Sequence, residues 1–170
     1  PEAHPLSPAI HNAWLEAAGI DGAYVPFAPA DAAGFEALVA AGRAGLILGL
    51  NITAPFKQQA FALADEATKA ARLTGSANIL QFIDGRVLAD SSDGIGLMLG
   101  LRKHAPELEV DGRAVVMLGA GGAARAGAGA LVEAGAEVRI INRSRDHAEA
   151  LAADLGPAVR VAEPAEAFDG

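Results

Sequence analysis

The sequence contains no cysteine, which excludes disulfide bonds and thiolate catalysis and suits a reducing cytoplasm. It also has no long apolar run. The apolar stretches are short or are broken by glycine and charge, as between Gly119 and Gly135. The first residues lack the basic and then apolar pattern of a secretory signal. We therefore expect a cytoplasmic protein with no membrane partner.

Basic residues are also fewer than acidic ones. The 21 acidic residues outnumber the 13 lysines and arginines, and the formal charge is -8. This charge argues against nucleic acid as a partner. The four histidines show no paired metal-ligand spacing, so we expect no metal site. With 52% hydrophobic residues in 170, the composition is typical of a compact enzyme.

A lysine follows the first strongly apolar segment. The run Leu46–Leu50 leads into Asn51–Lys57, and the pattern predicts a buried strand over 46–52 and a helical stretch over 55–73. Ligands of open α/β sheets bind outside the carboxyl ends of the strands, which makes Lys57 a candidate for chemistry. The alternative is an ordinary solvated lysine.

A glycine-rich loop provides the second candidate site. The expected strand Ala114–Leu118 leads into G-x-G-x-x-A at Gly119–Ala124, then into a helix and a strand at Glu137–Ile141. In such a βαβ unit the first glycine permits a tight turn, and Gly121 lets backbone amides approach a pyrophosphate. We predict dinucleotide contacts from Gly119, Ala120, Gly121, Gly122 and Ala123.

The residues after the second strand of this unit indicate which dinucleotide binds. An NAD site places a carboxylate about twenty residues past the glycines, to accept from the ribose hydroxyl. This sequence has Asn142, Arg143, Ser144 and Arg145 there. Guanidinium and hydroxyl groups suit a 2′-phosphate, so the predicted cofactor is NADP. Alternatively, the arginines only begin a helix, although cations oppose the dipole at that end.

The remaining pattern alternates helices and strands, as an α/β fold requires. Predicted helices cover 8–18, 31–42 and 94–104, and predicted strands cover 23–27, 77–83 and 86–89. The last two strands flank Asp84-Gly85, a strong hairpin signal. The polar segment 106–112 precedes the nucleotide unit. We therefore expect two domains, 1–97 and 98–170.

Six motifs in order resemble the shikimate dehydrogenase family. They are His4-Pro5-Leu6-Ser7-Pro8 with His11-Asn12, Asn51 to Lys57, Gly75-Ser76-Ala77-Asn78, Ser91-Ser92-Asp93-Gly94, GAGGAARA, and Asn142-Arg143-Ser144. The resemblance implies an α/β substrate-binding domain followed by a Rossmann-type NADP-binding domain. It also implies NADPH-dependent reduction of 3-dehydroshikimate to shikimate, a step toward chorismate and the aromatic amino acids.

The resemblance assigns roles to matching residues. It implies that Lys57 and Asp93 form the catalytic pair, and that Ser7, Thr53 and Asn78, together with Asp93, bind the substrate. Lys57 would donate a proton as hydride reaches the ketone, while Asp93 would hold the ammonium and accept from a substrate hydroxyl. Asp93 has a second interpretation as a helix N-cap, which is compatible with the first.

Some positions depart from the family pattern. Pro5 and Ile79 stand where relatives have serine and threonine, Ser91-Ser92 replaces asparagine and threonine, and His147 replaces a basic residue. Pro5 and Ile79 favour an alternative, a dehydrogenase of quinate or another ring hydroxy acid. A second alternative is a non-catalytic NADP-binding module, which would explain the short chain but would leave Lys57 and Asp93 without a role.

The ends of the chain also differ from the family. Relatives begin with a strand before the His4 motif and continue beyond Val161 with further strands and helices. We therefore expect both domains to be incomplete, and the 170-residue segment alone to have low stability and little turnover. The sequence does not determine the oligomeric state and leaves a homodimer open.

Overall fold

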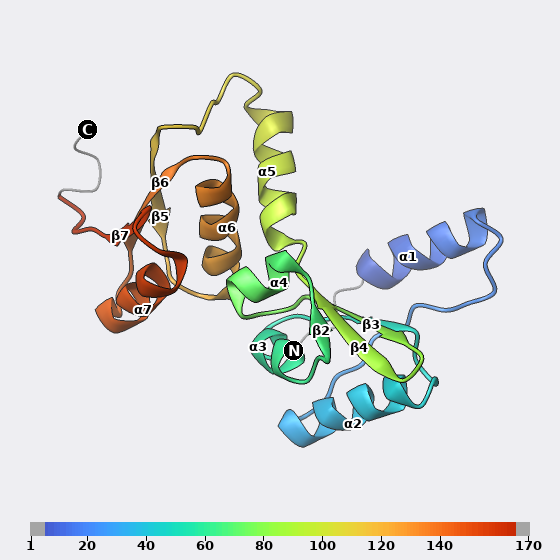
Figure 1. Cartoon of the computed structure of the whole chain (residues 1–170). Helices are drawn as coiled ribbons and strands as arrows, with labels where there is room; N and C mark the ends of the chain where they lie inside the picture. The colour runs from blue at the N-terminus through green and yellow to red at the C-terminus, as the bar shows by residue number, and fades with distance from the viewer. Residues whose placement is uncertain (1–5, 166–170) are drawn as a thin grey trace. The chain divides into compact units, whose positions relative to one another are not determined.

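The computed structural model describes residues 6–165 (Figure 1). The chain forms two compact units, Pro1–Ala37 and Leu38–Gly170. Both α-helices and β-sheets are present, which confirms the α/β prediction. Within residues 6–165, no helix combines the length and apolarity needed to cross a bilayer.

The first unit is built around helix α1, Leu6–Ala17. The Asn12 side chain accepts from the Tyr24 N–H at 2.7 Å and donates to the Tyr24 carbonyl at 3.0 Å. The His11 ring stacks on the Tyr24 ring with centroids 4.2 Å apart. The predicted strand at 23–27 is wrong. Side-chain contacts satisfy the backbone of Tyr24, and this segment pairs with no strand among the described residues.

Helix α2, Ala32–Arg43, begins where the sequence predicts it. Asp31 Oδ1 accepts from the Gly34 N–H at 2.8 Å, as a residue that precedes a helix commonly does. Further along, Gly42 lies against Phe82, where an added Cβ would come 2.3 Å from the ring. Glycine at 42 therefore lets this end of α2 approach the sheet closely.

A four-stranded sheet lies in the second unit. Its strands are β1 (Gly49–Asn51), β2 (Glu66–Ala67), β3 (Ile79–Ile83) and β4 (Arg86–Asp90), in the order β1-β3-β4-β2. Strands β3 and β4 form the predicted hairpin, with positive φ at Asp84 and Gly85 as a two-residue turn requires. Strand β1 is antiparallel to β3, and β2 is parallel to β4.

The long buried strand predicted over 46–52 is mostly wrong. The strand covers only Gly49–Asn51, and Leu46 and Leu48 are 80% and 86% exposed. Strand β1 has β3 as its one neighbour in the described sheet, so it is an edge strand. An apolar run alone could not reveal this position.

The helix predicted over 55–73 is two short helices. Helix α3 spans Lys57–Ala62, and helix α4 spans Lys69–Thr74. Strand β2 interrupts them because this segment pairs with β4, with Thr68 N–H donating to the Ala89 carbonyl at 2.9 Å. Thr68 then caps α4 through its hydroxyl, which accepts from the Ala71 N–H.

The nucleotide unit follows the predicted βαβ order. Strands β5 (Ala114–Leu118), β6 (Glu137–Ile141) and β7 (Val159–Val161) form a parallel sheet in sequence order. Helices α6 (Gly122–Glu133) and α7 (Arg145–Leu155) connect them. Their shared core includes Leu131, Val138, Ile140, Leu151 and Val159. Strand β5 is a continuous apolar run, as is common in parallel sheets, and its predicted bounds match the structure.

Helix α5, Asp93–His104, precedes this sheet and packs beside α6 (Figure 1). The helix begins one residue earlier than predicted, so Asp93 is its first residue and Ser92 occupies the N-cap position. The N-cap interpretation of Asp93 is therefore wrong. As the first residue of the helix, the carboxylate still interacts favourably with the positive end of the helix dipole.

Candidate active site

A lysine and an aspartate form a close ion pair in the second unit. Lys57 is the first residue of α3, Asp93 is the first residue of α5, and Lys57 Nζ lies 2.5 Å from Asp93 Oδ2. The two side chains are 22% and 28% exposed. They are thus partly desolvated, which strengthens their attraction, and still open to a small molecule. The sequence placed these residues 36 positions apart, and the fold joins them.

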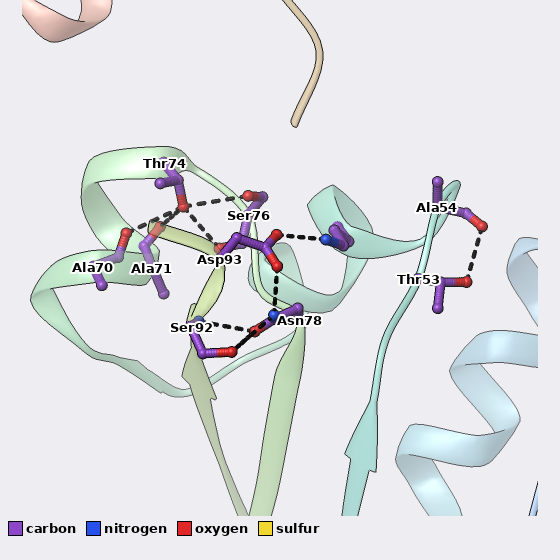
Figure 2. Close-up of polar contacts among 10 residues, drawn as sticks. Thr53, Ala54, Ala70, Ala71, Thr74, Ser76, Asn78, Ser92 and Asp93 are labelled. Carbon is purple, nitrogen blue, oxygen red and sulfur yellow. Dashed lines mark hydrogen bonds and ion pairs between the residues drawn. The ribbon is translucent and has the colours of Figure 1, made fainter. Parts of the chain in front are cut away.

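Asn78 supplies a third group on the same carboxylate (Figure 2). Its Nδ2 donates to Asp93 Oδ1 at 2.8 Å, so each oxygen of Asp93 has one donor. The oxygen of the amide, Asn78 Oδ1, accepts from the Ser92 N–H at 3.0 Å. Because a backbone N–H can only donate, this bond orients the amide with its NH₂ group toward Asp93.

Ser92 is a member of this group that the sequence did not reveal as a site residue. Its hydroxyl oxygen accepts from Asn78 Nδ2 at 3.0 Å, in addition to the backbone bond. One sequence feature could have identified Ser92: it is a serine directly before Asp93-Gly94, and serine commonly precedes the first residue of a helix. We call Lys57, Asn78, Ser92 and Asp93 the polar cluster.

The sheet positions Asn78. Its N–H donates to the Asp90 carbonyl at 3.0 Å, and its carbonyl accepts from the Ile52 N–H at 2.8 Å. The residue before it, Ala77, is fully buried and donates its N–H to the Lys57 carbonyl at 2.9 Å. The backbone of Asn78 is therefore held between the ends of β1 and β4.

Buried hydroxyl groups stabilise the connection that leads to Asn78. Thr74 and Ser76 are 4% and 3% exposed, and Ser76 Oγ donates to Thr74 Oγ1 at 3.2 Å. Thr74 Oγ1 also lies 3.0 Å from the Ser76 carbonyl. Between them, Gly75 ends α4 with φ 57, a conformation in which glycine avoids steric strain. The Gly75-Ser76-Ala77-Asn78 motif is thus a rigid support for the amide.

Two predicted substrate residues are not part of the polar cluster. Thr53 follows β1 and is exposed, and its hydroxyl donates to the Ala54 carbonyl at 3.2 Å, away from the labelled Asn78 and Asp93 (Figure 2). Ser7 lies in α1 of the first unit, where its carbonyl bonds to His11 Nδ1 at 2.8 Å.

The glycine loop leaves its backbone accessible. Gly119 has φ 111, which disfavours any side chain, and its N–H donates to the Ile141 carbonyl at 2.8 Å. Gly121 precedes α6 without a side-chain cap, so the first amides of this helix are not covered by a capping group. An added Cβ at Gly121 or Gly122 would meet nothing within 4 Å. This open helix start fits a phosphate group.

The two arginines after β6 differ. Arg145 contacts Glu149 at 2.8 Å and Glu163 at 2.5 Å. The hydrogen bond and charge of Glu149, aided by the charge of Glu163, raise the pKa of Arg145. Arg143 is exposed, and among the described residues no hydrogen bond or ion pair engages it. Between them, Asn142 Nδ2 donates to the Ser144 carbonyl at 2.7 Å and shapes the turn before α7. Arg143 is the cation better placed for an anionic ligand.

A surface pocket of about 530 Å³ lies elsewhere in the second unit. It is lined by Lys69, Arg72, Leu73, Gly75, Arg125 and Asp154, none of which was predicted as a site residue. Two of its cations are already paired, Lys69 with Glu133 and Arg125 with Asp154, each at 2.6 Å. Residues 6–165 contain no group of three His, Asp or Glu side chains arranged for a metal.

Comparison with known families matches both halves of the chain. Residues 1–80 match the family model described as the shikimate dehydrogenase substrate binding domain. Residues 101–167 match the model described as shikimate / quinate 5-dehydrogenase. The two matches lie in the order that the motifs predict.

Individual relatives agree with these matches. Shikimate dehydrogenase (NADP(+)) of Caulobacter vibrioides is 50% identical over 161 residues, which are 94% of this chain and 56% of that protein. The shikimate 5-dehydrogenase of Thermus thermophilus, in complex with shikimate, is 35% identical with a TM-score of 0.84, over 98% of this chain and 61% of that one. A quinate dehydrogenase of Corynebacterium glutamicum, in complex with NAD, is 28% identical with a TM-score of 0.82, over 95% and 61%. The chain spans little more than half the length of these relatives.

Proposed function

The chain belongs to the shikimate dehydrogenase family, and we propose that the protein reversibly reduces 3-dehydroshikimate to shikimate with NADPH. The family matches and the Caulobacter relative confirm the predicted family, and we infer the reaction from that family. The polar cluster carries this proposal. It places an ammonium and an oriented amide within hydrogen-bond distance of one carboxylate, at a partly exposed position.

We propose that Lys57 is the proton donor of this reaction. NADPH, when bound, supplies a hydride to the ketone carbon. A C–H bond forms there, and the π electrons of the C=O bond move to oxygen, where the Lys57 ammonium delivers a proton. Proton transfer to a developing oxyanion typically contributes about 10²–10⁴-fold in rate. Lys57 recovers its proton from solvent, with which its side chain is in contact.

Asp93 and Asn78 prepare the substrate side of this step. Asp93 orients the ammonium through its Oδ2 atom, and its carboxylate can also accept from a substrate hydroxyl. Asn78 holds Asp93 from the opposite oxygen, and its amide can bond to a ring hydroxyl. Ser7 and Thr53 are proposed to complete the contacts with the substrate. This proposal rests on their motifs alone.

The cofactor proposal uses the second sheet. The loop amides at Gly119, Ala120, Gly121, Gly122 and Ala123 would hold the pyrophosphate at the start of α6. Asn142, Arg143, Ser144 and Arg145 would receive the 2′-phosphate, with Arg143 as the principal cation. We propose that residues 1–97 form the substrate domain and 98–170 the NADP domain. A cytoplasmic location fits the lack of cysteine.

A second candidate function is oxidation of quinate. The similarity to the Corynebacterium quinate dehydrogenase supports it, as does Ile79, the apolar residue next to Asn78. Pro5, the other altered position, lies outside the described residues. A pocket that lacks a hydroxyl donor discriminates less sharply among ring hydroxy acids.

A substrate panel tests both candidates. The purified full-length protein is incubated with NADP⁺ or NAD⁺ and with shikimate or quinate, and formation of the reduced cofactor is followed by absorbance. Preferred oxidation of shikimate with NADP⁺ supports the proposed function. Preferred oxidation of quinate supports the second candidate. Tight NADP binding with no turnover of either acid contradicts both and favours a non-catalytic module.

A further inference from the structure

The start of α5 lies unusually close to α6 at a single glycine. An added Cβ at Gly94 would come 2.8 Å from the Ala126 carbonyl oxygen and 3.0 Å from Ala130 Cβ. Ala126 is 2% exposed and belongs to the backbone of a packed helix, so it cannot move aside as a flexible side chain would. Gly94 has no positive φ, and the constraint at this position is one of space alone.

This contact lies between the two halves of the proposed site. Gly94 directly follows Asp93, whose carboxylate holds Lys57 and Asn78. Ala126 is in the first turns of α6, shortly after the glycine loop. The backbone of Ser92 anchors the same turn of α5, since its carbonyl accepts from the Gly96 N–H at 2.9 Å and its N–H donates to Asn78. A shift of α5 against α6 would therefore move Asp93 relative to the loop.

We propose that Gly94 is a positioning residue for hydride transfer. Its missing side chain lets α5 and α6 approach closely enough to hold the Lys57–Asp93 pair at the correct separation from the dinucleotide loop. This inference rests on the proposed function. Any side chain at 94 forces the helices apart by several tenths of an ångström, because ordinary contact begins at 3.4 Å. Misplacement of about 1 Å can cost on the order of 10²-fold in rate.

Three glycine-to-alanine variants form a graded test. Gly94→Ala inserts a methyl group against backbone. Gly127→Ala, on the facing helix, inserts one 3.0 Å from the flexible end of Leu97, a milder clash. Gly96→Ala is the matched control, since it lies in α5 and its Cβ would meet nothing within 4 Å. All three variants replace a helical glycine by alanine, and they differ chiefly in the space that the methyl group meets.

The measurements are kcat, KM, NADP affinity, melting temperature and the primary deuterium isotope effect with NADPH labelled at the transferred position. For Gly94→Ala we expect kcat to fall about tenfold, because the displacement of several tenths of an ångström is smaller than the 1 Å that costs about 10²-fold. NADP affinity should be unchanged and the isotope effect should rise, because the hydride step becomes more rate-limiting. Gly96→Ala should match wild type, and Gly127→Ala should lie between them.

The isotope effect separates positioning from damage to the fold. A partly unfolded variant has fewer active molecules, which lowers kcat but leaves the isotope effect unchanged. A Gly94→Ala protein with wild-type kcat, or with lower kcat and an unchanged isotope effect, would overturn the inference. If Gly94→Ala does not melt cooperatively, the test uses Gly127→Ala instead. In that case, the same kcat and isotope effect in Gly127→Ala and Gly96→Ala would also overturn the inference. If the wild-type protein turns over no ring acid, the proposed function is wrong, and the inference about Gly94 is wrong with it.

Discussion

The two sheets of the second unit build their candidate sites by different means. In the β5-β6-β7 sheet each strand pairs with the next in sequence, and the proposed dinucleotide contacts come from one loop and the turn after β6. The polar cluster joins the starts of α3 and α5 with the residue before β3, around a sheet ordered β1-β3-β4-β2. A backbone site can therefore follow from one continuous segment, whereas a side-chain site requires the whole fold.

The largest effect should come from removing the ammonium of the polar cluster. Lys57→Ala is expected to lower kcat about 10²–10⁴-fold, because the proton donor is lost, while NADP affinity is unchanged. Steady-state kinetics and a binding titration check this. Lys69→Ala is the matched control, since the Lys69 side chain is 84% exposed and pairs with Glu133. Equal losses in both variants would contradict the role of Lys57.

The next effect tests the nucleotide half. Arg143→Ala is expected to weaken NADP binding about 10–100-fold, the equivalent of a charged hydrogen bond of about 1.5–3 kcal/mol. NAD binding should not change, because NAD lacks the 2′-phosphate. Titrations with both cofactors measure the difference.

Arg145→Ala is the companion variant. Because two carboxylates already engage Arg145, we expect a smaller loss of NADP affinity than for Arg143→Ala. The reverse order would show that the ion pairs of Arg145 are exchanged for the cofactor. In that case the ion pairs that Arg145 forms without the cofactor would not indicate which arginine binds the 2′-phosphate.

A smaller effect is expected at Ser92, the residue of the polar cluster that sequence reasoning missed. Ser92→Ala removes the hydroxyl that accepts from Asn78 but keeps the backbone N–H bond to Asn78 Oδ1. One neutral hydrogen bond contributes about 0.5–1.5 kcal/mol, so we expect kcat/KM to fall about 2–10-fold. Ser92→Thr, which keeps the hydroxyl, should restore most of the rate. If Ser92→Thr does not restore the rate, the hydroxyl of Ser92 is not the cause of the loss.

The smallest effect concerns pH-dependent stability around β2. The hydrogen bond from Arg43 and that from the Val87 N–H hold the pKa of Asp65 below its ordinary value of 3.8. A carboxyl whose folded-state pKa is lowered stabilises the fold above its unfolded value and loses this contribution as pH falls through the folded value. Asp65→Asn should therefore lower the melting temperature at neutral pH.

The same argument predicts where that difference disappears. Below the lowered pKa, the wild-type carboxyl is protonated and resembles asparagine, so the two melting temperatures should converge. Asp84→Asn, in the exposed hairpin turn, is the control and should show no such dependence. A constant difference across the whole pH range would mean that the charge of Asp65 is not responsible.

Sequence patterns predicted some elements well for identifiable reasons. The strand Ala114–Leu118 was predicted with its observed bounds because it is a continuous apolar run, as is common for strands of a parallel sheet. The hairpin around Asp84-Gly85 was predicted because its turn needs positive φ at both positions. The same apolar criterion failed for Leu46 and Leu48, which precede an edge strand and are exposed.

The sequence by itself determined the βαβ unit and its glycine loop, because these depend on local backbone requirements within a continuous segment. Six motifs in order along the chain indicated the family. Only the tertiary structure decided that Lys57 and Asn78 each bond to a different oxygen of Asp93, that Ser92 orients the amide, and that Gly94 lies against α6. The physical reason is that hydrogen bonds between side chains and close helix contacts depend on distances of a few ångströms. Strand pairing and helix packing determine those distances, and spacing along the chain does not.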